Sequence, residues 1–311
     1  MAAARETVLV TGGTGFIGRQ AVRELTAAGH AVHVVSSRRG ADVPAGVETH
    51  VADLLRPGER ERVVAEVAAD RLMHLAWYVE PGQVWNSIEN VRWLEASLGL
   101  LRDFAAAGGR RAVIAGTCSE YGQHGGVCHE DRTPVEPANL YGVSKAALHS
   151  VAAPAAAQLG VELAWTRIFF AYGPGEHPVR LVASVARRLL AGEPAPCSHG
   201  MQERDYLSTQ DIGSALAAVL AADFTGVVNI GSGERRTLRE IVSKVAELTS
   251  GTELLRFGAI TPPPDDPPLL VADVSRLREE LGWSPSLTLD EGLALTVDWW
   301  REQRDQPGGG A

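Results

Sequence analysis

The stretch "YGVSK" places a phenol and an amine four residues apart, at Tyr141 and Lys145. On a helix, side chains with this spacing share one face. A Lys145 cation can then lower the pKa of the Tyr141 hydroxyl, and Tyr141 can exchange a proton with a carbonyl or carbinol oxygen. Thr117 follows an apolar run in "AVIAGTCSEYG", where its hydroxyl could bind the same oxygen. The pattern Y-x-x-x-K is common by chance, so the surrounding elements must decide whether this chemistry is available.

A glycine-rich segment, "TGGTGFIG", lies between an apolar run and an amphipathic stretch near the start of the chain. Gly12, Gly15 and Gly18 form G-x-x-G-x-x-G, and an overlapping G-x-G-x-x-G begins at Gly13. A glycine turn lets a pyrophosphate approach the backbone, and the N-terminus of the next helix supplies free N–H groups and a favourable dipole. The context predicts dinucleotide binding rather than a turn that is merely tight.

The end of the second predicted strand indicates which dinucleotide is bound. An NAD enzyme usually carries a carboxylate there for the ribose 2′-hydroxyl. This chain has "VVSSRRG" instead, with Ser37, Arg38 and Arg39 and no acid before Asp42. Hydroxyl and guanidinium groups suit a 2′-phosphate, which favours NADP(H); the alternative is an exposed charged loop. Asp53, after the third predicted strand, is placed to bond the adenine amino group.

Short apolar runs alternate with helical patterns through the first half of the chain. This alternation predicts an α/β fold of the Rossmann type, a doubly wound parallel sheet with helices on both faces. The runs that predict strands are "TVLVT" (7–11), "AVHVV" (31–35), "VETHV" (47–51), "LMHLA" (72–76), "AVIAG" (112–116) and "ELAWTRIF" (162–169).

The later part of the chain is less regular. Helical patterns follow Pro178 and Thr237, "GVVNIGSG" predicts a strand and turn, and two closing helices follow the extended connector "TPPPDDPPLL". The charged run "RPGERERVVAEVAADR" is most simply a solvated helix face. We expect a dinucleotide-binding domain over 1–170, to which one or two later segments return, and a smaller domain over 171–305. The tail, 306–311, should be disordered.

Composition excludes several classes of function. A chain of 311 residues with 22% charged residues is ordinary for a globular protein, and its net charge of −9 argues against nucleic acid or an anionic membrane as partner. No apolar run could span a bilayer. The N-terminal "MAAARE" lacks the apolar core of a signal peptide, so we expect a cytoplasmic protein.

Three cysteines without a CxxC pair fit a reducing compartment and no structural disulfide. The stretch "CSEYGQHGGVCH" brings Cys118, His124, Cys128 and His129 together and suggests zinc. Its spacing matches no common zinc template, so we expect a loop with incidental ligands and no metal site.

Taken together, seven motifs resemble the extended short-chain dehydrogenase/reductase family that acts on nucleotide sugars. The resemblance runs from about Thr7 to Trp300 and is specific for the family, though not for one reaction. It implies a Rossmann domain and a smaller C-terminal domain that binds the sugar nucleotide. The motifs are "TGGTGFIG", "HLAW" (74–77), "GTCSEYG", "YGVSK", "RIFFAYGPG", "QERDYLSTQDI" and "NIGSGERRTLREI".

The resemblance also implies roles for individual residues. Thr117, Tyr141 and Lys145 would form the catalytic triad, and Arg204 would contact the nucleotide diphosphate. In similar proteins, helices near 90–107 and 141–159 form a homodimer interface. The residues expected at the cofactor are Gly12, Thr14, Gly15, Phe16, Ile17, Gly18, Ser37, Arg38, Arg39, Asp53, Leu54, Leu75, Ala76, Tyr141, Lys145 and Phe169. Those expected at the substrate are Trp77, Cys118, Ser119, Phe170 and Arg204.

Departures from the family pattern narrow the reaction. Sugar 4,6-dehydratases resemble "STDEVYG", with an acid after the catalytic threonine that drives loss of water. Cys118 and Ser119 occupy those positions here, and neither is an acid at neutral pH. Glu120 comes one step later, where the family has a packing residue. Phe170 replaces a substrate-binding asparagine, which makes the sugar pocket more apolar and suggests a deoxygenated sugar.

We therefore expect an NADPH-dependent reductase of the C4 ketone in a nucleotide-linked 4-keto-6-deoxy sugar. Hydride would pass to C4, Tyr141 would protonate the alkoxide, and Thr117 would share that hydrogen bond. One alternative is a nucleotide-sugar 4-epimerase with tightly bound NAD. Another, of a different class, is a non-catalytic protein that binds NADP(H) as a sensor; the intact triad argues against it.

Overall fold

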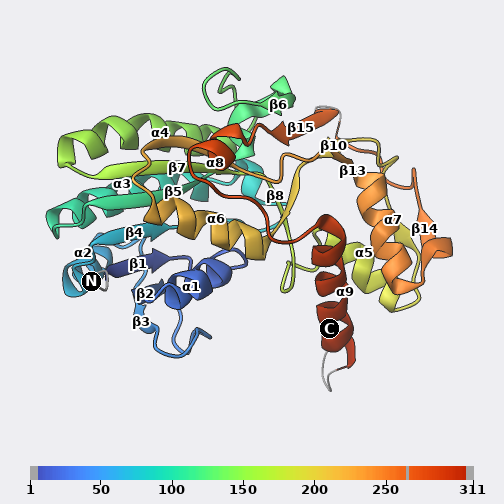
Figure 1. Ribbon diagram of the computed structural model, residues 1–311, viewed down its shortest axis with the longest axis horizontal. Helices are drawn as coiled ribbons and strands as arrows, with labels where there is room; N and C mark the ends of the chain where they lie inside the picture. Colours follow the sequence, from blue (N-terminus) through green and yellow to red (C-terminus); the bar gives the residue numbers. More distant parts are fainter. Residues whose placement is uncertain (1–5, 264–265, 306–311) are drawn as a thin grey trace.

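The centre of the molecule is a parallel sheet of seven strands, in the order β12-β7-β5-β4-β1-β2-β3 (Figure 1). The computed structural model describes residues 6–263 and 266–305. Every neighbouring pair in this sheet is parallel, which confirms the predicted Rossmann-type α/β fold. The strands are β1 (Thr7–Thr11), β2 (Ala31–Ser36), β3 (Glu48–Val51), β4 (Arg71–His74), β5 (Arg111–Thr117), β7 (Glu162–Ile168) and β12 (Gly226–Ile230).

Helices cover both faces of this sheet because the central strands are apolar on both sides. In β1, Val8 and Val10 pack into one core while Leu9 packs into the other, and all three are fully buried. The first face carries α1 (Gly18–Ala27) and α6 (Thr209–Ala221), and the second carries α2 (Pro57–Val67), α3 (Glu89–Ala106) and α4 (Leu140–Leu159).

A third core lies at the end of the molecule opposite α2 (Figure 1). It is built from the apolar faces of α5 (Leu181–Leu190), α7 (Leu238–Thr249) and α9 (Leu289–Asp305). The remaining short elements are β6 (Gly126–Cys128), β8 (Phe170–Tyr172), β9 (Ala195–Pro196), β10 (Glu203–Arg204), β11 (Tyr206–Ser208), β13 (Arg236–Thr237), β14 (Leu255–Arg256), β15 (Leu269–Ala272), α8 (Ser275–Glu279), and the 3₁₀ helices η1 (Val84–Asn86), η2 (Cys118–His124) and η3 (Thr252–Leu254).

The six strands expected in the first half are all present, within one or two residues of their expected limits. Segments from later in the chain also join this part of the molecule: β12 pairs with β7, and α6 packs beside α1. The division into domains over 1–170 and 171–305 stays a prediction. The expected tail, 306–311, lies outside the described residues. No helix in the described part of the chain is long and apolar enough to cross a membrane.

The charged run in α2 is not simply a solvated face. Arg60 is only 4% exposed, and its Nε lies 2.6 Å from Oδ2 of Asp103 on α3. That expectation was wrong for Arg60 because α3 packs over this part of α2 and supplies a carboxylate, which makes burial of the guanidinium tolerable.

Candidate active site

Two glycines of the loop after β1 are required by the fold itself. Gly12 has φ of +71°, and a Cβ there would lie 2.7 Å from the backbone nitrogen of Ala76. A Cβ at Gly18 would lie 2.0 Å from the carbonyl oxygen of Gly12. Gly15 is different, because it is exposed. The tight turn therefore explains Gly12 and Gly18, whereas a Cβ at Gly15 would lie 3.1 Å from the carbonyl oxygen of Gly12 and face open solvent.

The N-terminus of α1 is open to a ligand. No side chain caps its first turn, and Phe16, Ile17 and Gly18 line the adjacent cavity. Free N–H groups and the helix dipole at such an end favour a phosphate group. The residues present therefore fit the diphosphate of a dinucleotide.

The cavity lined by Thr117, Tyr141 and Lys145, which we call the main cavity, has a volume of about 520 Å³ and lies at the carboxyl ends of β1, β4, β5 and β7. In open α/β sheets this edge is the usual ligand crevice. The fold thus brings most of the predicted site residues together, although they come from separate segments of the chain. Those that line the cavity are Gly12, Gly15, Phe16, Ile17, Gly18, Leu75, Ala76, Trp77, Thr117, Cys118, Ser119, Tyr141, Lys145, Phe169 and Phe170.

Two further cavities, which we call the first and second side cavities, adjoin residues of the glycine loop. Thr14 lines one of about 440 Å³, and Ser37 and Arg38 line another of about 790 Å³. The remaining predicted residues line none of these three cavities; they are Arg39, Asp53, Leu54 and Arg204.

Asp53 and Leu54 follow β3 and serve the local structure. Leu54 is 6% exposed and packs in the core on the second face of the sheet. The Asp53 carboxylate accepts a hydrogen bond from the backbone N–H of Leu55 at 3.0 Å and lies 3.4 Å from Nε of Arg56. Its side chain is 41% exposed, so the carboxylate can still meet a ligand, and the adenine contact stays a prediction.

Thr117 is fixed at the end of β5 by a capping box. Its hydroxyl accepts a hydrogen bond from the Ser119 N–H at 3.2 Å, while its own N–H donates to Oε1 of Glu120 at 2.9 Å. Reciprocal bonds of this kind fix how the chain enters a helix, here η2. The hydroxyl of Thr117 is therefore held at the cavity wall.

Tyr141 lies in the first turn of α4 and reaches the same cavity. Asn139 caps this helix by accepting the Gly142 N–H at 3.0 Å. Burial raises the pKa of Tyr141 to about 12, against a smaller lowering by its hydrogen bond with Thr117. The positive charge of Arg180 also lowers the pKa of Tyr141, by less than burial raises it. Tyr141 is therefore protonated at neutral pH.

Lys145 follows one turn later and is 3% exposed. Its Nζ donates to the carbonyl oxygen of Ala115 at 2.7 Å and lies 3.8 Å from the ring centroid of Trp77. Burial lowers the pKa of Lys145 to about 7. The amine faces a carbonyl oxygen and an aromatic ring, and its effect on the pKa of Tyr141 stays a prediction.

Glu120 is a buried support for the site and does not line the cavity. It is fully buried, and its carboxylate accepts hydrogen bonds from Nε1 of Trp165 at 3.0 Å and Nε of Arg167 at 2.8 Å, as well as from the Thr117 N–H. Gly116 leaves room for it, since a Cβ there would lie 2.5 Å from Oε1 of Glu120. Glu120 stands at a position where a packing residue was expected, and it forms a buried ion pair with Arg167 there.

Cys118 and Ser119 stand where sugar 4,6-dehydratases carry an acid, and neither is an acid at neutral pH. Cys118 is buried against the cavity, and burial raises the pKa of its thiol to about 12. Ser119 lines the cavity beside it. Both observations support the inference that this site does not eliminate water.

Arg204 does not line the cavity. Its guanidinium lies 2.5 Å from Oδ1 of Asp266 and 5.5 Å from the ring of Phe170, which does line the cavity. Arg204 is 3% exposed. A diphosphate contact therefore requires Asp266 to share or release the guanidinium, and this role stays a prediction.

Sequence reasoning missed three residues at the site: Arg19, Trp85 and Arg180. Arg19 lines both side cavities and follows Gly18 directly, so its place was a usable signal. Arg180 lines the main cavity and one side cavity, and its Nε lies 3.7 Å from Glu176. Trp85 meets the Tyr141 ring edge-on, with centroids 6.0 Å apart. The last two lie outside the long helices and strands, where the sequence offers no signal.

Residues 8–231 match the model of the NAD dependent epimerase/dehydratase family. The chain belongs to this family. It is 30% identical to the UDP-glucose 4-epimerase of Azospirillum brasilense, over 99% of this chain and 98% of that protein. It is similar to the Thermus thermophilus UDP-glucose 4-epimerase in complex with NAD (30% identity, TM-score 0.84, 95% of this chain and 99% of that one). It is also similar to DesIV, a dTDP-glucose 4,6-dehydratase from Streptomyces venezuelae with NAD and TYD bound (28% identity, TM-score 0.85, 96% and 98%).

Membership of the epimerase/dehydratase family confirms the resemblance to extended short-chain dehydrogenase/reductases and their fold. The finer expectations receive no such support. Both similar structures contain NAD rather than NADP, and the three similar proteins are 4-epimerases and a 4,6-dehydratase. Family membership therefore supports an NAD(P)-dependent enzyme without singling out the ketoreductase reaction.

Proposed function

We propose that this protein is an NAD(P)-dependent oxidoreductase acting at C4 of a nucleotide-linked sugar, and that its net reaction is reduction of a 4-keto-6-deoxy sugar by NADPH. The observation that carries the proposal is the meeting of Thr117, Tyr141 and Lys145 with the glycine loop in one cavity. The names of its relatives support the substrate class, since they act on UDP-glucose and dTDP-glucose.

The chain's own residues account for the proton in this reaction. A nicotinamide cofactor bound at the glycine loop supplies the hydride. Tyr141, whose pKa is raised to about 12, is protonated at neutral pH and can protonate the sugar oxygen as C4 is reduced. Thr117, which hydrogen-bonds to Tyr141, can bind that same oxygen. A protonated tyrosine suits reduction better than oxidation, which needs a base.

Lys145 has a pKa of about 7, so it exists in both protonation states near neutrality. As an ammonium it can donate hydrogen bonds to the ribose hydroxyls of the cofactor. Burial of its amine near Tyr141 also places an exchangeable proton within the site, which can restore the tyrosine after each turnover.

The preference for NADP(H) rests on the loop after β2. Ser37, Arg38 and Arg39 are exposed there, and the second side cavity brings Arg19 beside Ser37 and Arg38. Guanidinium groups form strong, charge-assisted bonds with phosphate. Several of them at one place, with no carboxylate on the same loop before Asp42, support recognition of a 2′-phosphate.

A nucleotide-sugar 4-epimerase is the second candidate. The observation in its favour is the 30% identity to UDP-glucose 4-epimerases over nearly the whole chain. Such an enzyme would use the same triad, return the hydride to the other face of the sugar and keep its NAD bound. Net consumption of the cofactor separates the two reactions.

The part of the chain over 171–305 would bind the sugar nucleotide, with Phe170 and Trp77 on the apolar side of the sugar pocket. A homodimer would form through α3 and α4, whose outer sides expose Arg92 and Val151. The protein would work in the cytoplasm, where NADPH is available.

The test is a substrate panel with the purified full-length chain. NADPH and NADH are each incubated with 4-keto-6-deoxy sugar nucleotides, with UDP-glucose and with dTDP-glucose, and products are identified by NMR. The proposal predicts oxidation of NADPH in proportion to a C4-reduced product. Epimerised UDP-glucose with no cofactor consumed, or NAD retained through purification, would favour the second candidate. Formation of a 4-keto-6-deoxy sugar from dTDP-glucose would contradict the roles given to Cys118 and Ser119.

A further inference from the structure

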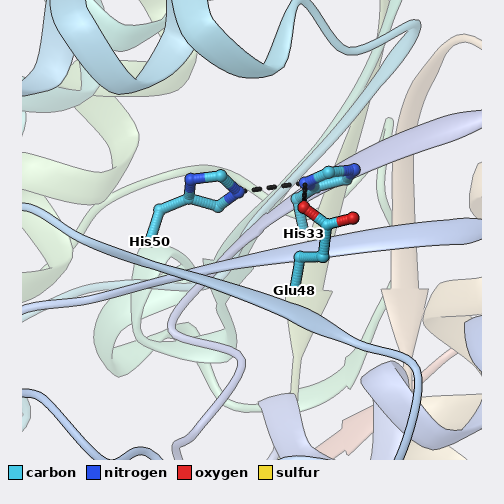
Figure 2. Close-up of side chains that lie close together, drawn as sticks. All are labelled: His33, Glu48 and His50. Atoms are coloured by element: carbon cyan, nitrogen blue, oxygen red, sulfur yellow. Dashed lines mark hydrogen bonds and ion pairs between the residues drawn. The ribbon is translucent and has the colours of Figure 1, made fainter.

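Three potential metal ligands meet on β2 and β3, at the edge of the central sheet (Figure 2). They are His33 on β2 and Glu48 and His50 on β3. The parallel register pairs His33 with Glu48 and Val35 with His50. Paired residues on neighbouring strands point to the same face, as do residues two apart on one strand. All three side chains therefore lie on one face of the sheet, with Glu48 directly opposite His33 and His50 diagonal to it.

The distances suit a small metal ion. Nδ1 of His33 lies 3.0 Å from Nε2 of His50 and 3.6 Å from Oε2 of Glu48. All three ligand atoms lie within 4.8 Å of one another. Zinc holds nitrogen and oxygen ligands at about 2.0–2.1 Å in a tetrahedron, which places neighbouring ligand atoms roughly 3.3–3.4 Å apart. The observed spacings lie on either side of that value, so small side-chain rotations would complete the site.

We propose that His33, Glu48 and His50 bind one divalent transition-metal ion of the Zn²⁺ or Co²⁺ type, at a site separate from the catalytic cavity. Two imidazoles and one carboxylate are the donor set that these ions prefer, whereas Mg²⁺ and Ca²⁺ require mostly oxygen ligands. None of the three residues lines the main cavity. The sequence predicted no metal because these ligands belong to two strands and no local motif.

The surroundings leave the site accessible. The imidazoles are half-buried and stack with ring centroids 5.2 Å apart, while the Glu48 side chain is 72% exposed. In the metal-free arrangement the two rings share one hydrogen bond. An ion would replace the shared hydrogen and bind the carboxylate as well, with its fourth position open to water.

Metal binding would stabilise the pairing of the edge strand β3 with β2. β3 is only four residues long and is the outermost strand. Just beyond it, the N–H of Ala52 donates to the carbonyl oxygen of Ser36 at 3.0 Å, next to the loop that begins at Ser37. The proposed ion would therefore stabilise the pairing of β2 with β3 close to the start of the loop that carries Ser37 and Arg38.

The test uses the full-length chain without a histidine tag, stripped with EDTA and dialysed. Zn²⁺ binding is measured by calorimetry, and Co²⁺ binding by its visible absorption. Glu48→Gln removes an exposed ligand and keeps the side-chain shape, and His50→Gln removes a second ligand. His30→Gln is the matched control, since His30 lies just before β2 and its Nδ1 is 4.0 Å from Glu6, outside the cluster.

The wild-type protein and His30→Gln should each bind one equivalent of Zn²⁺, which should also raise the melting temperature. Glu48→Gln and His50→Gln should bind at least about tenfold more weakly, because each loses a direct ligand. Their unfolding curves without metal show whether they are folded. Absence of saturable binding to the wild-type protein would overturn the proposal. So would binding whose affinity survives both ligand substitutions, because the ion would then be held elsewhere.

Discussion

Glu120 offers a sharp test, because its sequence position invites a catalytic role and its contacts indicate a structural one. The substitution Glu120→Gln keeps the shape of the side chain and removes its charge. Glu120 and Arg167 are 0% and 3% exposed at their side chains, and they lie 2.8 Å apart. The substitution therefore leaves a buried guanidinium without its carboxylate. It also places an amide donor against the N–H groups of Trp165 and Arg167.

The expected cost follows from these contacts. Removing one partner of a buried ion pair typically costs about 3–5 kcal/mol, because the other charge stays buried and unpaired. At about 2 °C per kcal/mol for a chain of this size, the melting temperature should fall by roughly 6–10 °C. The rate constant per folded molecule should stay nearly unchanged, because the amide oxygen of the substituted side chain can still accept the hydrogen bond from the Thr117 N–H.

Urea and thermal unfolding, followed by circular dichroism, measure the first effect, and turnover below the melting temperature measures the second. The control is Glu66→Gln, whose carboxylate pairs with Arg62 at 2.9 Å while both side chains are more than half exposed. That change should cost less than about 1 kcal/mol. If Glu120→Gln were as stable as the control but lost its activity, Glu120 would be a catalytic acid and the structural argument would fail.

Three further predictions concern the site. Tyr141→Phe should lower kcat/KM for NADPH oxidation by about 10²–10⁴-fold, because the proton donor is lost, with nucleotide-sugar binding nearly unchanged by calorimetry; an unimpaired rate would exclude Tyr141 as the donor. Arg38→Ala should weaken NADPH binding and leave NADH binding nearly unchanged in calorimetry, and equal loss for both cofactors would remove the 2′-phosphate contact. Burial lowers the pKa of Lys145 from 10.5 to about 7, so the unfolded chain binds more protons between these values and the free energy of unfolding rises with pH across that window. Relative to Lys145→Met, the wild-type protein should gain roughly 2 kcal/mol in urea unfolding between about pH 7 and about pH 9; parallel pH profiles would show that the amine is not buried as described.

Local patterns in the sequence were sufficient to predict the fold and the glycine loop after β1. The apolar runs that became the central strands did so because a parallel sheet is buried on both faces and demands continuous apolar segments. The glycine loop was recognisable because its requirements are local: Gly12 needs a positive φ, and Gly18 leaves no room for a Cβ beside Gly12. Thr117 and Tyr141 were found through motifs attached to a strand end and a helix start.

Contacts between distant segments were decided by the tertiary structure alone. Glu120, just after β5, meets Arg167 on the neighbouring strand β7, and Arg204 meets Asp266 across 62 residues of chain. Burial, which raises the pKa of Tyr141 and lowers that of Lys145, depends on which elements pack over each residue. His33, Glu48 and His50 meet only through the register of β2 and β3. A sequence records spacing along the chain, so it determines turns, strands and helix faces by itself; distance through space and exclusion of water arise only when the elements pack together.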